Sequence, residues 1–372
     1  MTSTHSNGSE VSEQGSQEPI ENRQSTGSGA DAPAAENENA DSNGANGGEN
    51  AFDNVERPTT YVEDENQLEA DSEILQEFED DCESIDVSHM KIMSLKPLGL
   101  SRFQNLKSIC FRQNLLTSMQ GIEDLPEEME EIDFYDNRLS HMDRRLEKFG
   151  SHIKSLDLSF NNFRHIKHLQ NMTQMTDLYL CQNDIGKIVN LNCLTNLTNL
   201  ELGANRIKTI RGLEKLVNLE QLWLARNKIS KIEGLETLKN LKLLSIQSNR
   251  ITTIEGLEEL TNLEELYISY NHLEKIEGLE NNTKLTTIDV ARNRISELGG
   301  LDHLTNLEEL WASGNQLTSF ENVEQQLKHL PNFHTIYLEQ NPLQRTAGAT
   351  YRNKVRLALG TSLQQIDATP IR

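Results

Sequence analysis

From Cys82 onward, the apolar residues of this chain follow one repeating pattern, in which leucine or isoleucine occupies fixed positions around an asparagine. The pattern reads L-x-x-L-x-L-x-x-N-x-L, and a clear copy contains Leu219, Leu222, Leu224, Asn227 and Ile229. Eleven asparagines mark its copies: Asn114, Asn137, Asn161, Asn183, Asn205, Asn227, Asn249, Asn271, Asn293, Asn315 and Asn341. A further copy without the asparagine starts at Cys82, so we count twelve units. Self-similarity at this period predicts a leucine-rich-repeat solenoid.

Spacing within and between the units predicts their local structure. In L-x-L the two leucines point into the core and the intervening residue points out, as in any strand. We expect the strands to stack into a curved parallel sheet on the concave face, which places the fold in the α/β class. Glycines recur every 22 residues at Gly212, Gly234, Gly256, Gly278 and Gly300, with Asn190 and Asn322 in the same slot. Glycine and asparagine tolerate a left-handed backbone, so a tight turn is expected there.

Units of 22 residues leave little chain for the convex face, where we expect short 3₁₀ or single-turn helices. The seven steps from Asn161 to Asn315 are all of this length, and the outer steps are 23, 24 and 26 residues. Each asparagine amide can donate to and accept from backbone groups that the turn away from the strand would otherwise bury unpaired.

The two ends of the chain differ from the repeats. Residues 1–65 are rich in Ser, Gly, Asn, Glu and Ala, a composition that predicts a disordered acidic tail. Residues 66–81 are a possible N-terminal cap, with Leu68, Ile74, Leu75 and Phe78 on one helical face; an acidic linker is the alternative. The array of about twelve units covers residues 82–343. Residues 344–372 form a C-terminal cap, with a helix expected over Tyr351–Leu359.

Charge and composition exclude several possible functions and locations. The formal net charge is −23, and residues 1–80 account for most of it with 20 acidic and 2 basic residues. A net-acidic protein repels phosphate backbones, so nucleic acid is disfavoured as a ligand. No signal peptide or run of about 20 apolar residues is present, so we expect neither secretion nor a membrane anchor. Four cysteines without a CxxC pattern are typical of reduced thiols in the cytosol or nucleus.

Catalytic and metal-binding motifs are absent from the sequence. It contains no HExxH, no GxxxxGK[ST], no GxSxG and no Cys/His cluster at metal-ligand spacing. We therefore expect that the protein is not an enzyme and needs no metal or cofactor.

The residue between the two strand leucines should project from the concave face. Unit by unit, this row reads Asp86, Cys110, Asp133, Asp157, Tyr179, Glu201, Trp223, Ser245, Tyr267, Asp289, Trp311 and Tyr337. The row two residues earlier adds Glu131, Asp177, Glu265 and Glu309. Exposed strand positions generally favour aromatic and polar residues, which explains one or two such rings. Five large aromatics aligned with acids instead indicate a protein-binding surface for a partner with basic and apolar groups.

The inner surface is large enough for a folded partner. Twelve strands at about 4.8 Å give a face on the order of 50 Å long. A compact domain of about 300 residues has a radius of gyration near 19 Å and hence a similar diameter. The expected partner is therefore a globular domain.

The repeats and the C-terminal stretch together resemble a known family. Ile-Glu-Gly-Leu recurs at 232–235, 254–257 and 276–279, and the chain ends with Tyr337-Leu-Glu-Gln-Asn-Pro-Leu, then Tyr351-Arg and Ile366-Asp-Ala-Thr. Over about residues 82–372 this resembles regulatory subunit 7 of protein phosphatase 1. The resemblance implies a nuclear and cytoplasmic protein that binds the catalytic subunit of protein phosphatase 1 on its concave face and controls its activity. Carried over position by position, the family's contact residues are Asp157, Tyr179, Glu201, Trp223, Asp289, Glu309, Trp311 and Tyr337.

Tyr267 completes the predicted protein-binding set, and it is included because it lies in the concave row and not because of the resemblance. The chain departs from the family in two ways. Tyr179 and Trp223 stand where the family tends to have phenylalanine, which keeps the aromatic character while changing the contact shape. The long acidic tail has no counterpart in the family pattern. The alternative functions are a leucine-rich-repeat scaffold for a cytoskeletal complex, or a ribonucleoprotein component. A basic concave face would favour the ribonucleoprotein, and the acidic row counts against it.

Overall fold

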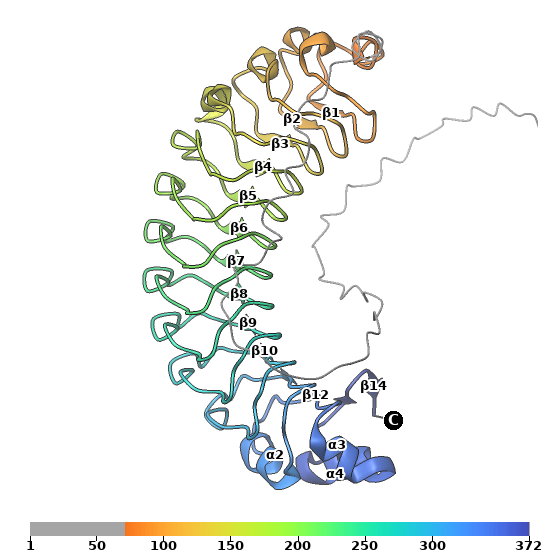
Figure 1. Ribbon diagram of the computed structural model, residues 1–372, viewed down its shortest axis with the longest axis vertical. Helices are drawn as coiled ribbons and strands as arrows, with labels where there is room; N and C mark the ends of the chain where they lie inside the picture. Colours follow the sequence, from red (N-terminus) through yellow and green to blue (C-terminus); the bar gives the residue numbers. More distant parts are fainter. Residues whose placement is uncertain (1–70, 372) are drawn as a thin grey trace, which may run out of the picture. The chain divides into compact units, whose positions relative to one another are not determined.

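The computed structural model describes residues 71–371, which lie within the compact unit formed by Tyr61–Arg372. Fourteen strands form one sheet in sequence order, and they follow the inner side of a curved array (Figure 1). The first twelve are parallel three-residue strands, one per repeat: β1 Ser84–Asp86, β2 Ser108–Cys110, β3 Glu131–Asp133, β4 Ser155–Asp157, β5 Asp177–Tyr179, β6 Asn199–Glu201, β7 Gln221–Trp223, β8 Leu243–Ser245, β9 Glu265–Tyr267, β10 Thr287–Asp289, β11 Glu309–Trp311 and β12 Thr335–Tyr337. The predicted leucine-rich-repeat solenoid of about twelve turns is confirmed.

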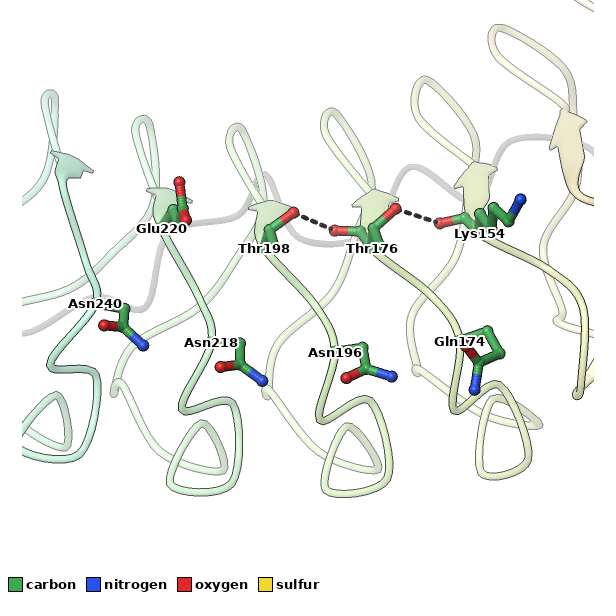
Figure 2. Close-up of a pocket in the computed structure, with 8 residues that line it drawn as sticks. All are labelled: Lys154, Gln174, Thr176, Asn196, Thr198, Asn218, Glu220 and Asn240. Carbon is green, nitrogen blue, oxygen red and sulfur yellow. Dashed lines mark hydrogen bonds between the residues drawn. The ribbon is translucent and has the colours of Figure 1, made fainter.

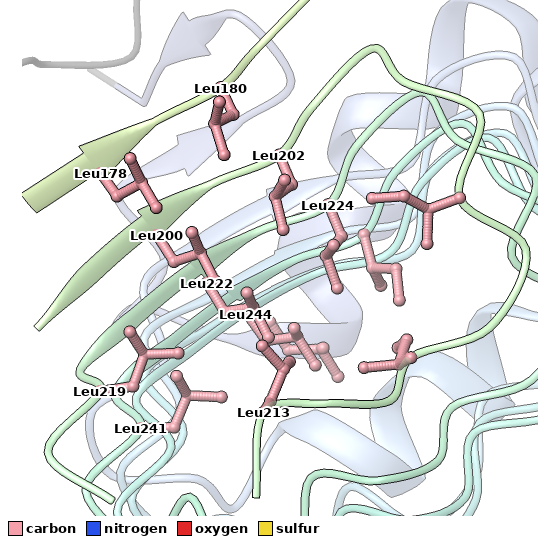
Figure 3. Packing of buried hydrophobic residues seen from close by; sticks show 14 of the residues in the cluster. Leu178, Leu180, Leu200, Leu202, Leu213, Leu219, Leu222, Leu224, Leu241 and Leu244 are labelled. Carbon is pink, nitrogen blue, oxygen red and sulfur yellow. The ribbon is translucent and has the colours of Figure 1, made fainter. Parts of the chain in front are cut away.

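A single continuous apolar core runs through the array. In each unit the middle strand residue and the apolar residue two positions later are buried, as Leu222 and Leu224 are. Equivalent leucines stack from one turn onto the next (Figure 3). Each turn is thus covered on both sides by identical neighbours, which is why one repeat alone would leave its apolar face exposed.

Asparagine side chains hold the turn that follows each strand. Asn227 donates from Nδ2 to the carbonyls of Leu202, 2.9 Å away, and Leu224, 3.1 Å away. Its Oδ1 accepts from the Ile207 amide, which belongs to the preceding repeat, at 2.9 Å. The same bonds recur along the array, so the predicted role of the asparagine is confirmed. Each of these amides joins two successive repeats through groups that would otherwise be buried without partners.

Glycines shape the tight turn on the convex side. Gly278 has a φ of 72°, and a Cβ there would lie 2.4 Å from the carbonyl oxygen of Ile254. Asn190 occupies the same slot in its own unit with a φ of 64°. The expectation for Asn322 was wrong, because this residue lies inside the α-helix α2 (Phe320–Leu327). Its side chain still donates to the Leu298 carbonyl at 2.9 Å, as that of Asn190 does to Ile166.

Helices on the convex face occur in the units longer than 22 residues. The short 3₁₀ helices are η1 (Lys96–Leu98), η2 (Leu100–Arg102), η3 (Ile122–Asp124) and η4 (Arg144–Phe149), and α2 occupies the longest unit. The 22-residue units have successive single turns instead, such as Leu194 N–H to the Leu191 carbonyl and Leu197 N–H to the Leu194 carbonyl. Extra residues are therefore what allow a convex helix to form.

Both ends of the described array are covered. At the C-terminal end lie α3 (Pro342–Ala347), η5 (Gly348–Thr350), α4 (Tyr351–Leu359), β13 (Gln365–Ile366) and β14 (Thr369–Pro370). At the N-terminal end, residues 71–81 form turns in which Leu75 is buried. Arg102 donates to the carbonyls of Leu75 and Phe78, which ties this segment to the first repeat. The predicted tail over residues 1–65 and Leu68 of the predicted cap lie outside the described residues.

Candidate functional site: the concave face

All the predicted interface residues except Glu309 lie in one row across the concave sheet, because each is the last residue of its strand. We call this the central row, and it contains Asp86, Cys110, Asp133, Asp157, Tyr179, Glu201, Trp223, Ser245, Tyr267, Asp289, Trp311 and Tyr337. Every member pairs in register with the next, from Asp86 with Cys110 to Trp311 with Tyr337. The spacing between neighbours is therefore set by the sheet, on the order of 5 Å.

Eight of the nine predicted residues form two uninterrupted stretches of this row. One stretch is Asp157, Tyr179, Glu201 and Trp223, and the other is Tyr267, Asp289, Trp311 and Tyr337. The buried Ser245 alone separates them. Glu309, the ninth residue, begins strand β11 and lies two residues before Trp311.

The C-terminal stretch is an aromatic cluster with carboxylates beside it. The ring of Trp311 lies 6.0 Å from that of Tyr267 and 5.7 Å from that of Tyr337, in tilted and edge-on arrangements. Such geometries are favourable for aromatic pairs. The Trp311 indole N–H donates to Glu309 at 3.0 Å, and the Tyr267 hydroxyl donates to Glu265 at 2.6 Å. The rings are consequently held in place before any partner arrives.

Asp289 lies between Tyr267 and Trp311 in the sheet and is only 6% exposed. Burial raises the pKa of its carboxyl group, although the Ser269 side chain and the Ala291 amide both donate to it. A carboxylate in this position has already lost most of its water, so pairing with a cation costs the carboxylate little further desolvation.

The N-terminal stretch combines a tyrosine, a tryptophan and two partly buried carboxylates. Burial, and after it the charge of the neighbouring Asp133, raise the pKa of Asp157 to about 6. Arg112 opposes that shift, with Nη2 3.2 Å from the Asp157 carboxylate. Burial also raises the pKa of Glu201, and that of the adjacent Cys181 thiol to about 12.

Tyr179 is fixed by polar neighbours in the adjacent row. Its hydroxyl donates to Asp177 at 3.4 Å and accepts from Asn199 at 3.2 Å. Burial is the main reason that its pKa rises to about 12. The phenol therefore stays protonated and presents a neutral, oriented ring edge to the concave surface.

Sequence reasoning missed a third element of the concave face, formed by Arg112, Tyr135 and Phe160. The guanidinium of Arg112 lies 4.8 Å from the centre of the Tyr135 ring, and that ring lies 4.7 Å from Phe160. Arg112 and Tyr135 stand two residues after the central row in their repeats. Reading that second outward position down the repeats would have found them.

A polar groove beside the starts of the strands is lined by Lys154, Gln174, Thr176, Asn196, Thr198, Asn218, Glu220 and Asn240 (Figure 2). Asn196 and Asn218 donate to the carbonyls of Thr173 and Thr195, both at 2.9 Å. The Thr198 hydroxyl donates to the Thr176 carbonyl at 3.1 Å. These side chains already satisfy backbone groups of the preceding repeat, so we assign the groove a structural role.

The described residues contain neither a metal-binding cluster nor a helix that could span a membrane. Among residues 71–371, no group of three His, Cys, Asp or Glu side chains is arranged to hold a metal ion. Nor does any helix in that range have the length and apolar character to cross a bilayer.

The similarity of this chain to known proteins lies mainly in its repeats. The model of the family described as "Leucine Rich repeats (2 copies)" matches residues 195–237, 217–259, 239–281, 261–303 and 283–329. An internalin from Listeria monocytogenes has a similar structure, with a TM-score of 0.61 over 83% of this chain and 96% of that one. The two are 22% identical, so this likeness supports the fold alone.

Two curated relatives are both named protein phosphatase 1 regulatory subunit SDS22. The protein from Saccharomyces cerevisiae is 48% identical over 106 residues, or 28% of this chain and 31% of that one. The protein from Schizosaccharomyces pombe is 46% identical over 83 residues, or 22% of this chain and 24% of that one. The matches thus span less than a third of either relative. Both names describe regulatory subunits, and the matching family model describes a repeat, so neither comparison points to an enzyme.

Proposed function

Because this chain is a leucine-rich-repeat member of the protein phosphatase 1 regulatory subunit 7 family, to which the SDS22 proteins belong, we propose that it binds the phosphatase catalytic subunit. The central row would be the contact surface, and binding would control the activity of the enzyme. The observation that carries the proposal is the pair of four-residue stretches in which aromatic and acidic residues stand side by side in register.

The aromatic side chains supply the apolar part of such an interface. Tyr and Trp dominate the energetics of protein interfaces, because they cover a large area at low cost in conformational entropy. The Trp311 ring contacts both Tyr267 and Tyr337, and all three side chains keep part of their surface exposed. A partner that covers all three at once would exclude water from a continuous apolar patch.

The carboxylates supply the charged part. Asp157, Glu201 and Asp289 each have a pKa raised by burial, which means that the free protein holds these charges in a poorly hydrated environment. An arginine or lysine of the partner would stabilise the ionised forms. Much of the desolvation that normally offsets an interfacial ion pair is thereby completed before binding.

Titration of the purified catalytic subunit against the full-length chain tests this proposal. We expect Trp311→Ala to weaken binding by about 2–4 kcal/mol, the range for a buried aromatic anchor. Glu201→Gln should weaken it by about 1–3 kcal/mol through loss of a charged pair. Lys215→Ala, at an exposed convex position, is the control and should bind like the wild type.

Two outcomes would count against the proposal. Equal affinities for all the variants would remove the central row as the contact surface. No binding by the wild type would remove the phosphatase as the partner and leave a scaffold for another complex. A phosphatase assay on the same mixtures measures whether binding changes activity.

We also propose that the protein resides in the nucleus and the cytoplasm, where the expected partner would be met. Fractionation of cells followed by detection of the chain in both compartments tests this. Exclusive recovery from either compartment would contradict it.

A further inference from the structure

The edge of the concave face at the asparagine turns carries a ladder of positive charge over strands β6 to β10. Two positions per repeat lie on this edge, one immediately before and one immediately after the asparagine. In these five repeats they hold Ala204, Arg206, Arg226, Lys228, Ser248, Arg250, Tyr270, His272, Arg292 and Arg294. Six of the ten are Arg or Lys and none is acidic. We call Arg206, Arg226, Lys228, Arg250, Arg292 and Arg294 the basic rim.

The backbone holds this rim in strict register. The amides of Lys228 and Arg250 donate to the carbonyls of Ile207 and Ile229 in the preceding repeats, at 2.8 and 2.7 Å. The amide of Arg292 donates to Ser313 in the following repeat at 2.8 Å. Successive rungs therefore stand about 4.8 Å apart, and the rim from β6 to β10 extends on the order of 19 Å.

The rim charges are largely unneutralised within the part of the chain that the structure describes. Of the six side chains, only Arg206 has a carboxylate within ion-pair distance, Asp184 at 2.9 Å. Arg226, Arg250, Arg292 and Arg294 are exposed, and Lys228 is half-buried. Like charges aligned on a rigid ladder repel one another, so an anionic partner that spans several rungs would relieve that repulsion.

The contrast with the rest of the molecule makes the rim a distinct feature. The chain as a whole has a formal net charge of −23. The same two edge positions in the first repeats hold both charges, for example Asp136, Arg138 and Asp184. The central row next to the rim is acidic and aromatic, and the proposed function accounts for that row without using the rim.

We propose that the basic rim is a second interaction surface, which binds an acidic extended segment of a partner protein. About six residues of extended chain, at about 3.3 Å each, match the length of the rim. In such a segment every second side chain faces the rim, so the side chains that face it are about 6.6 Å apart. This distance differs from the spacing of about 4.8 Å between successive repeats of the rim. Recognition then depends on charge and not on side-chain register, so binding is moderate and sensitive to salt.

The test is a titration of the full-length chain into a fluorescein-labelled peptide of about twelve residues in which glutamate alternates with serine. We expect binding at low salt that weakens about tenfold between 50 and 200 mM sodium chloride. The double variant Arg226→Glu/Arg250→Glu should weaken it a further fivefold or more. Lys215→Glu/Arg345→Glu changes the net charge equally at exposed sites away from the rim and should bind like the wild type.

Several outcomes overturn the proposal. One is that the wild-type chain does not bind the peptide, and another is that the two double variants weaken peptide binding equally. A third is that an oligothymidylate of equal charge binds more tightly than the peptide in a rim-dependent way, which would assign the rim to nucleic acid. Displacement of the peptide by the phosphatase catalytic subunit would assign the rim to the phosphatase interface. Because the peptide is first titrated against the free chain, the result stands apart from whether the phosphatase binds.

Discussion

The indole N–H of Trp311 donates a hydrogen bond to the carboxylate of Glu309, 3.0 Å away on the same strand. Both residues belong to the predicted interface, yet they have different roles in this geometry. The ring is the contact surface, and the carboxylate fixes the plane in which that surface lies. A ring that is oriented before binding loses less conformational entropy when the partner arrives.

Glu309→Ala should therefore weaken phosphatase binding by about 1 kcal/mol through loss of this orientation, whereas Glu309→Gln, which keeps an acceptor, should lose less. Calorimetric titration of both variants, alone and combined with Trp311→Ala, measures the coupling. If the Glu309→Ala penalty is unchanged in the absence of Trp311, the carboxylate acts on the partner directly.

Asn227→Ala should lower the free energy of unfolding by about 1–3 kcal/mol, because buried backbone groups of two repeats lose their partners. Asn262→Ala is the matched control. Its side chain makes only exposed bonds, donating to the Lys239 carbonyl at 2.7 Å and accepting from the Lys284 ammonium at 2.7 Å, so its cost should be smaller. Denaturant unfolding of both variants decides the comparison, and equal costs would contradict the role assigned to burial.

Asp157→Asn should stabilise the protein at neutral pH and have little effect near pH 4. Burial raises the folded pKa of Asp157 to about 6 from an ordinary value of 3.8. The folded state then binds more protons than the unfolded state between these values, so its stability falls as pH rises through that window. Asparagine cannot ionise and keeps an acceptor for the Ser159 amide, 2.9 Å from the aspartate.

The expected gain at pH 7 is on the order of 1–3 kcal/mol. Thermal melts of wild type and variant between pH 4 and 8 measure it. A difference that does not change with pH would show that ionisation of Asp157 is not its cause.

Cys181 should react with iodoacetamide at pH 8 at least about tenfold more slowly than Cys193. Burial and the neighbouring Glu201 raise the pKa of the Cys181 thiol to about 12, so little thiolate is present. Cys193 is exposed on the convex side. Peptide mapping of a labelling time course gives both rates, and faster labelling of Cys181 would contradict its placement beside Glu201.

Deletion of residues 1–65 should preserve both folding and phosphatase binding, because no repeat leucine lies in that segment. Circular dichroism and the titration described above measure the two properties. Loss of binding with folding intact would place part of the interface in the deleted segment.

Repetition explains how much of this structure could be predicted from the sequence. Because Leu222, Leu224 and Asn227 recur at a fixed step, their inward positions follow from strand alternation, and the row containing Trp223 must then point outward. The pairing register of neighbouring strands also follows from the repeat, because parallel stacking of equivalent units places corresponding residues opposite one another.

Other features could not be obtained from the repeat period alone. Asn322 was expected in a left-handed turn, but its unit is four residues longer than the 22-residue units, and the extra chain forms helix α2. The burial of Asp289 depends on rings contributed by the strands on either side. The contact of Arg112 with Asp157 joins residues two repeats apart. Such effects depend on side-chain packing across repeats, which a one-dimensional pattern does not contain.

Strand β14 gives the array a defined length. It pairs antiparallel with β13, so it reverses the direction in which every preceding strand was added. It consists of Thr369 and Pro370 only, and proline has no amide hydrogen to donate. A strand added at the outer edge would therefore find neither the direction nor the amide donors of the thirteen parallel strands that precede β14. A sheet built by adding equivalent strands would otherwise act as a template for another chain, and this short reversed strand opposes such addition at the C-terminal edge.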